Sequence, residues 1–144
     1  MDPNLLHFFA IHGRRALRIQ FKRFANHYPM NTAAILFAIA ALGGITMAMI
    51  RFTGRDYPPM WLAIIHGLFA AAGLVALIAV VFGGGAATSL SIALLLFVIA
   101  AIVGFVLFSY HLKSRPLPIP TMITHALFAV VAFLILIVVL LSVT

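Results

Sequence analysis

Two histidines occupy the same local sequence frame in an otherwise apolar chain. His66 lies in "PMWLAIIHGLFA" (59–70) and His125 lies in "PIPTMITHALFA" (118–129). In each stretch a proline stands seven positions before the histidine, and Leu-Phe-Ala follows after one small residue. Imidazole binds metal ions and titrates near neutral pH, and an ionisable side chain in an apolar span usually faces a partner, a cavity or a cofactor. The pair therefore indicates metal ligation or proton binding.

Haem b is the cofactor that best suits two such imidazoles in a chain without cysteine. Axial histidines on facing helices can hold the iron from both sides, and the core of a helix bundle supplies an apolar slot. We expect His66 and His125 to be the iron ligands, and Phe69 and Phe128, three residues after them, to line the ring edge. The haem propionates would pair with the basic residues at the nearer membrane face, which are Arg51, Arg55, Lys113 and Arg115.

Two other interpretations of the histidine pair stay open. Each imidazole could be a neutral, structural group that hydrogen-bonds to a Ser, a Thr or a backbone carbonyl, and Thr124 is a possible orienting partner of His125. Zinc or copper could bind instead, but two imidazoles fall short of the four ligands of a structural zinc site. His111 could add a third, although its position beside Lys113 and Arg115 predicts a solvated interfacial side chain.

The elements that position the histidines are transmembrane helices. Of the 144 residues, 65% are hydrophobic and only 8% are charged, which is typical of an integral membrane protein. Four stretches, 31–50, 59–82, 89–110 and 119–143, satisfy the requirement of about 20 largely apolar residues per span. We expect an all-α, four-helix transmembrane domain over residues 31–144, in a bacterial inner membrane.

The first 30 residues predict a separate, basic amphipathic segment. One helical face carries four basic residues and another carries three apolar ones, Arg14, Arg15, Arg18 and Lys22 against Leu17, Phe21 and Phe24, although Arg23 and Ile19 blur the division. This pattern is typical of a helix that lies at the membrane surface. Such a segment would contact anionic lipid headgroups. The net charge of +7 sits beside the spans and so sets membrane topology; it does not predict a nucleic-acid partner.

The chain contains an internal duplication. "FAIAALGG" (37–44) matches "FVIAAIVG" (97–104) with a shift of 60, and the two histidine stretches match with a shift of 59. We therefore divide the domain into repeat one (31–82) and repeat two (89–144). Because each repeat has two spans, both copies should have the same orientation, related by a pseudo-two-fold axis along the membrane normal. His66 and His125 should then lie at the same depth.

The paired "HGLFA" and "HALFA" stretches within the spans resemble small membrane-bound b-type cytochromes. The resemblance covers the architecture, in which histidines on separate transmembrane helices hold haem inside a four-helix bundle. It implies electron transfer, haem handling or sensing. Those proteins often have several histidine pairs, whereas this sequence has one clear pair, which limits the prediction to a single haem.

Stand-alone catalysis is not expected. Asp2 and Asp56 are the only acidic residues, so general acid–base chemistry by paired carboxylates has no basis. Two alternative functions remain: an accessory or assembly subunit, which binds partner membrane subunits or a second copy through its lipid-facing surfaces, and a small transport bundle with a proton-sensitive histidine constriction.

Overall fold

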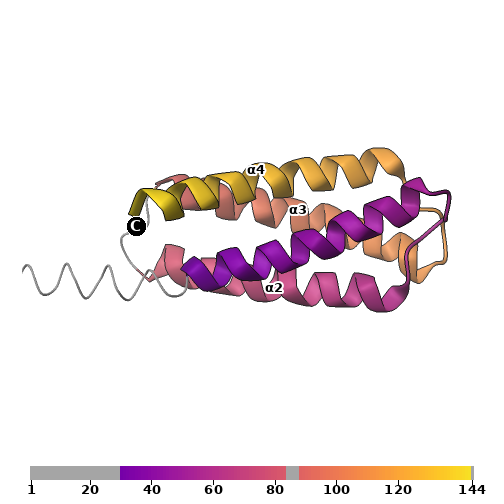
Figure 1. Ribbon diagram of the computed structural model, residues 1–144, viewed down its shortest axis with the longest axis horizontal. Helices are drawn as coiled ribbons and strands as arrows, with labels where there is room; N and C mark the ends of the chain where they lie inside the picture. The colour runs from indigo at the N-terminus through magenta and orange to yellow at the C-terminus, as the bar shows by residue number, and fades with distance from the viewer. Residues whose placement is uncertain (1–29, 84–87, 144) are drawn as a thin grey trace, which may run out of the picture.

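The computed structural model describes residues 30–83 and 88–143. In this part of the chain there are four helices, Met30–Phe52, α2 (Met60–Phe82), α3 (Thr88–Leu112) and α4 (Ile119–Val143). They lie side by side in one bundle (Figure 1). The predicted all-α, four-helix architecture is confirmed. The predicted interfacial segment over the first 30 residues falls almost entirely outside the described residues.

Each helix is long and apolar enough to cross a membrane. A helix of 23 residues spans about 35 Å at 1.5 Å per residue, and the hydrocarbon core of a bilayer is about 30 Å thick. Prolines mark the start of two helices: Pro59 is the N-cap of α2, and Pro120 is the second residue of α4. Proline is tolerated there because the first N–H groups of a helix have no intrahelical acceptor.

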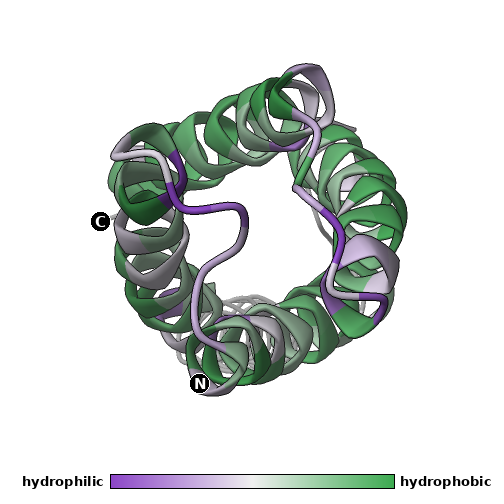
Figure 2. Ribbon diagram, turned by 90° about the vertical axis from the view of Figure 1, so that its right-hand side faces the viewer, coloured by the Kyte–Doolittle hydropathy of each residue, from purple (hydrophilic) through white to green (hydrophobic). Residues whose placement is uncertain are grey.

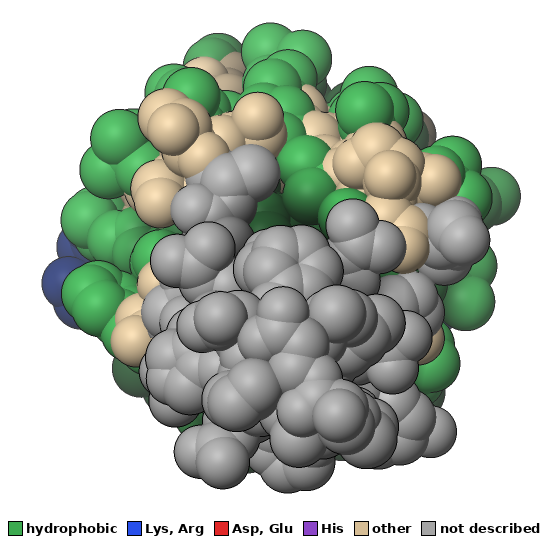
Figure 3. All heavy atoms as spheres, turned by 90° about the vertical axis from the view of Figure 1, so that its left-hand side faces the viewer, with side chains coloured by type: hydrophobic (Ala, Val, Ile, Leu, Met, Phe, Trp, Pro, Cys, Tyr) green, Lys and Arg blue, Asp and Glu red, His purple; other side chains and the backbone are tan. Residues whose placement is uncertain are grey.

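The outside of the bundle is as apolar as its inside. Large hydrophobic side chains such as Leu42, Phe105 and Leu127 are more than 60% exposed, which suits a surface that faces lipid. Figure 2, a view of one end, shows hydrophobic residues along the helices and hydrophilic ones in the connections. Figure 3 shows the opposite end, where the described side chains are mainly hydrophobic. This distribution is that of an integral membrane protein.

The core repeats the duplication seen in the sequence. Phe37 and Phe97, related by the shift of 60, are both 6% exposed, and Leu77 and Leu136, related by the shift of 59, are both fully buried. Ala33 and its equivalent, Ala93, are also fully buried. The two hairpins thus contribute equivalent side chains to one shared core, and the predicted tandem arrangement is confirmed.

The contacts between the hairpins define the pseudo-two-fold axis. Within each hairpin a histidine packs against the preceding helix: His66 against Gly44, and His125 against Gly104. Between the hairpins, equivalent residues meet each other: the rings of Phe37 and Phe97 stack, and the ring of His66 contacts that of His125. Both pairs of equivalent residues therefore lie on the axis of the bundle.

Candidate functional site

The histidine pair is the polar centre of the bundle. His66 on α2 and His125 on α4 face each other with ring centroids 6.1 Å apart and ring planes inclined by 68°. Both side chains are half-buried. Their contact confirms that the two imidazoles lie at the same depth, as the duplication predicts.

Each imidazole is held by a backbone carbonyl of the preceding helix. Nδ1 of His66 lies 2.8 Å from the carbonyl oxygen of Ala40, and Nδ1 of His125 lies 2.8 Å from that of Ala100. A carbonyl can only accept, so Nδ1 carries the proton and donates in both rings. Nε2 then has its lone pair available, and no group among residues 30–83 and 88–143 forms a hydrogen bond with it.

Glycines make the approach of the imidazoles possible. A Cβ atom at Gly44 would lie 3.2 Å from Cε1 of His66, and one at Gly104 would lie 3.1 Å from Cε1 of His125. Small residues are common at helix interfaces in membranes because they allow close packing. Here the space that they leave is filled by an imidazole in both hairpins.

Stacked phenylalanines bound the site on one side. The rings of Phe37 and Phe97 are 3.8 Å apart and nearly parallel, at 2°. These residues stand three positions, one helical turn, before Ala40 and Ala100, so the stack lies on the axis on the side away from the 53–59 and 113–118 connections. Sequence reasoning did not assign this role, although the repeat alignment places a phenylalanine at both positions.

Other predicted neighbours of the histidines have different positions or partners. Phe69 and Phe128 are half-buried, and the aromatic contact on the axis is the Phe37–Phe97 stack. The hydroxyl of Thr124 donates to the carbonyl of Pro120 in its own helix, 3.0 Å away. The backbone carbonyl of Ala100, and not Thr124, is therefore the orienting partner of His125.

The predicted basic residues lie at the end of the bundle formed by the 53–59 and 113–118 connections. Arg55, Lys113 and Arg115 are exposed there. Arg51 is half-buried, and its guanidinium joins the two connections: Nε donates to the carbonyl of Leu117 at 3.1 Å, and Nη1 donates to the carbonyl of Arg55 at 3.3 Å. This end of the bundle is basic, but the guanidinium of Arg51 already donates its hydrogen bonds to backbone carbonyls.

The prediction of a solvated His111 is wrong. Its side chain is only 5% exposed, and its ring meets that of Tyr57 edge-on at a centroid distance of 5.6 Å. Position 111 is the repeat equivalent of Arg51. Each hairpin therefore sends the side chain at this position toward the connection of the other hairpin, which explains the burial of His111.

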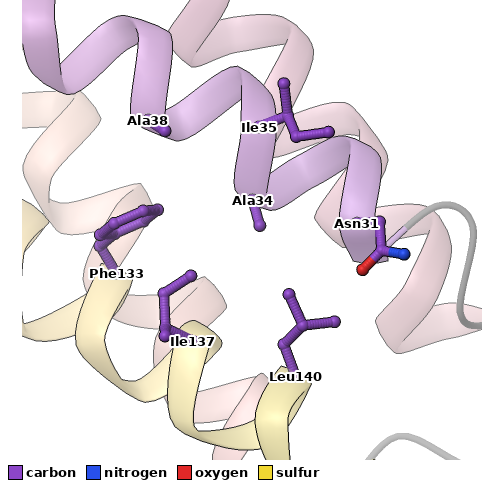
Figure 4. Close-up of a pocket in the computed structure, with 7 residues that line it drawn as sticks. All are labelled: Asn31, Ala34, Ile35, Ala38, Phe133, Ile137 and Leu140. Atoms are coloured by element: carbon purple, nitrogen blue, oxygen red, sulfur yellow. The ribbon is translucent and has the colours of Figure 1, made fainter. Parts of the chain in front are cut away.

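An apolar groove lies elsewhere, between the first helix and α4 (Figure 4). It has a volume of about 360 Å³ and is lined by Asn31, Ala34, Ile35, Ala38, Phe133, Ile137 and Leu140. None of the predicted site residues lines it. The groove is thus separate from the histidine pair.

The spacing of the two rings can be compared with that of two nitrogen ligands on one metal centre. Two Nε2 atoms that bind a metal ion from opposite sides at about 2.0 Å each would hold the ring centroids about 6 Å apart. No group of three or more possible metal-ligating side chains occurs in the described part of the chain, so a four-ligand zinc site would lack protein ligands. No family model, curated protein or solved structure matches the chain.

Proposed function

We propose that this protein is a haem-binding membrane subunit, similar in architecture to b-type cytochromes, that serves electron transfer or haem handling in a bacterial inner membrane. His66 and His125 would hold the iron of one haem b through Nε2. One observation carries the proposal: both imidazoles donate Nδ1–H to a carbonyl at the same 2.8 Å distance. Histidines that bind metals usually donate their other ring N–H to such an acceptor, which fixes the tautomer and the ring orientation.

The residues around the pair fit this cofactor in several respects. The ring spacing of 6.1 Å agrees with ligation from opposite sides, and the apolar helices would exclude water from the iron. The exposed Arg55, Lys113 and Arg115 are free to approach carboxylates at the basic end. When bound, haem would supply a one-electron couple whose potential depends on its axial ligands and on their hydrogen bonds.

An accessory or assembly subunit is the second candidate, because the same hydrogen bonds also serve a structural purpose. A neutral imidazole that donates to a carbonyl of the neighbouring helix ties a hairpin together without any ligand. The partner would then be another membrane subunit or a second copy, bound through the apolar outer surface. The transport alternative is less favoured, because the four described spans contain no acidic residue.

Haem titration of the detergent-solubilised protein tests the proposal. Asparagine is the informative substitution, because its amide can replace the Nδ1 donor but has nothing in place of Nε2. We expect one haem per chain in the wild type and its loss in His66→Asn and in His125→Asn. His111→Asn is the matched control, since His111 is a buried imidazole away from the axis, and it should keep its haem. Equal haem uptake by all four proteins would refute the proposal.

A further inference from the structure

The two glycines beside the histidines do more than permit helix packing. Gly44 follows Ala40 by four residues, and Gly104 follows Ala100 by four residues. In an α-helix the carbonyl of residue i accepts the N–H of residue i+4, and a side chain covers the turn that precedes its own Cα. A side chain at position 44 or 104 would therefore cover the carbonyl that the imidazole uses.

The distances agree with this reasoning. A Cβ atom at Gly44 would lie 3.2 Å from Cε1 and 3.6 Å from Nδ1 of His66; at Gly104 the corresponding distances to His125 are 3.1 and 3.3 Å. Contacts of 3.1 to 3.2 Å are shorter than ordinary van der Waals separations, so the imidazole would have to move. The movement would lengthen a hydrogen bond that is now 2.8 Å long.

The duplication supplies an internal comparison. Position 43 is glycine in repeat one and valine (Val103) in repeat two, and position 67 is glycine in repeat one and alanine (Ala126) in repeat two. A Cβ at Gly43 would approach His66 only to 3.4 Å, and one at Gly67 would meet nothing within 4 Å. Positions 44 and 104 are the equivalent pair that is glycine in both copies and at which an added Cβ atom would crowd the imidazole.

We propose that Gly44 and Gly104 are the positioning residues of the histidine pair. By leaving the carbonyls of Ala40 and Ala100 uncovered, they seat each imidazole as the Nδ1–H tautomer and leave both Nε2 atoms unprotonated. The site is thereby prepared for its metal before the metal binds. The identity of the metal as haem iron rests on the proposed function, whereas the seating of the imidazoles does not.

The tautomers can be measured in the haem-free protein. Nitrogen chemical shifts of ring-labelled histidine distinguish a protonated from an unprotonated ring nitrogen, and the His66→Asn and His125→Asn variants assign the signals. We expect Nδ1–H and unprotonated Nε2 in both rings of the wild type. Gly44→Ala should shift His66 toward the Nε2–H tautomer and leave His125 unchanged, and Gly104→Ala should do the reverse.

Gly67→Ala is the matched control, since Gly67 is adjacent to His66 in the chain but has open space around it; both tautomers should stay as in the wild type. Gly44→Val provides a larger side chain and should give a larger shift than Gly44→Ala. The inference would be overturned by an Nε2–H tautomer in the wild type, or by Gly44→Ala and Gly67→Ala spectra that are the same.

Haem binding gives a second readout. Loss of such an outer hydrogen bond typically lowers metal affinity about 10- to 100-fold, so Gly44→Ala and Gly104→Ala should each bind added haem at least about 10-fold more weakly than Gly67→Ala. If the wild type takes up no haem but the tautomers respond as expected, the proposed function fails and the positioning role stands. If haem binds and all three alanine variants bind it equally, the positioning role fails alone.

Discussion

At the scale of single residues, each histidine has two separable roles. Nδ1 ties α2 or α4 to the helix before it, through Ala40 or Ala100, and the proposed function assigns Nε2 to the haem iron. Interhelical hydrogen bonds in membranes contribute only about 0.6 kcal/mol on average. The structural role alone is therefore modest.

Asparagine and alanine substitutions separate these roles. His66→Ala should lower the free energy of unfolding in detergent by about 0.6 kcal/mol, because the hydrogen bond to the Ala40 carbonyl is lost. The free energy of unfolding of His66→Asn should be closer to that of the wild type, because the amide can replace the Nδ1 donor. Neither variant should bind haem. Measurement of unfolding in mixed micelles, together with haem content, checks both statements. If His66→Asn retained haem, the assignment of Nε2 as the ligand would be wrong.

The Phe37–Phe97 stack should be the main packing contact on the axis. Lipid is as apolar as the core, so the main cost of Phe37→Ala is the cavity that the missing ring leaves. At about 24 cal/mol per Å³ and a cavity of roughly 100 Å³, the free energy of unfolding should fall by about 2 kcal/mol. Phe105→Ala is the control, since Phe105 is 73% exposed and its loss should cost far less. Equal stability of the two variants would show that the stack contributes little.

At the scale of the helices, apolar length was enough to predict every described span to within a few residues. The repeat alignment also predicted the equal depth of the histidines. The partners of the histidines were harder to predict, because a backbone carbonyl has no sequence signature and any helical residue offers one. The useful signal was the repeated glycine at 44 and 104, which becomes meaningful only when the neighbouring helix is in place.

The burial of His111 was mispredicted for a related reason. Its neighbours in sequence, Lys113 and Arg115, are exposed, but its contact with Tyr57 comes from the other hairpin. Contacts between the two connections depend on how the hairpins associate. Composition near the end of a span does not reveal them.

Arg51 should hold the two hairpins together at this end. Arg51→Lys removes the Nε donor that reaches the Leu117 carbonyl, and one ammonium group cannot reproduce the two directions of the guanidinium. The Leu117 amide donates to the backbone carbonyl of Asp56. We expect this amide to exchange faster in Arg51→Lys, because the two connections are then held together less tightly. Arg55→Lys, at an exposed position, should leave that exchange unchanged. Equal exchange rates in the two variants would contradict the role of Arg51.

At the scale of the whole molecule, the duplication produces a bundle with two kinds of end. Both hairpin connections lie at one end, where Leu117 and Asp56 are joined through their backbones, and the basic residues in the described part of the chain gather there. The start of α3 lies at the other end (Figure 1). Two parallel hairpins thus place a symmetric pair of histidines in the bundle, each held by the equivalent carbonyl of its own hairpin.

The native chain lacks cysteine, so single cysteines can test this arrangement directly. Thr53→Cys and Ser114→Cys are at exposed positions in the two connections, and Ser89→Cys is at an exposed position near the start of α3. A membrane-impermeant thiol reagent applied to sealed vesicles should label the first two from one side and the third from the other. Labelling of positions 53 and 114 from opposite sides would contradict the two-plus-two arrangement.

The most direct test of the central claim is an absorption spectrum of the wild-type protein purified in mild detergent from haem-replete cells, recorded oxidised and then reduced. Two imidazoles that bind iron from opposite sides predict the narrow reduced bands of a low-spin b-type haem, absent from the His66→Asn and His125→Asn proteins. A folded, colourless wild type that also takes up no added haem would contradict the account and leave the accessory role as the better explanation of the histidine pair.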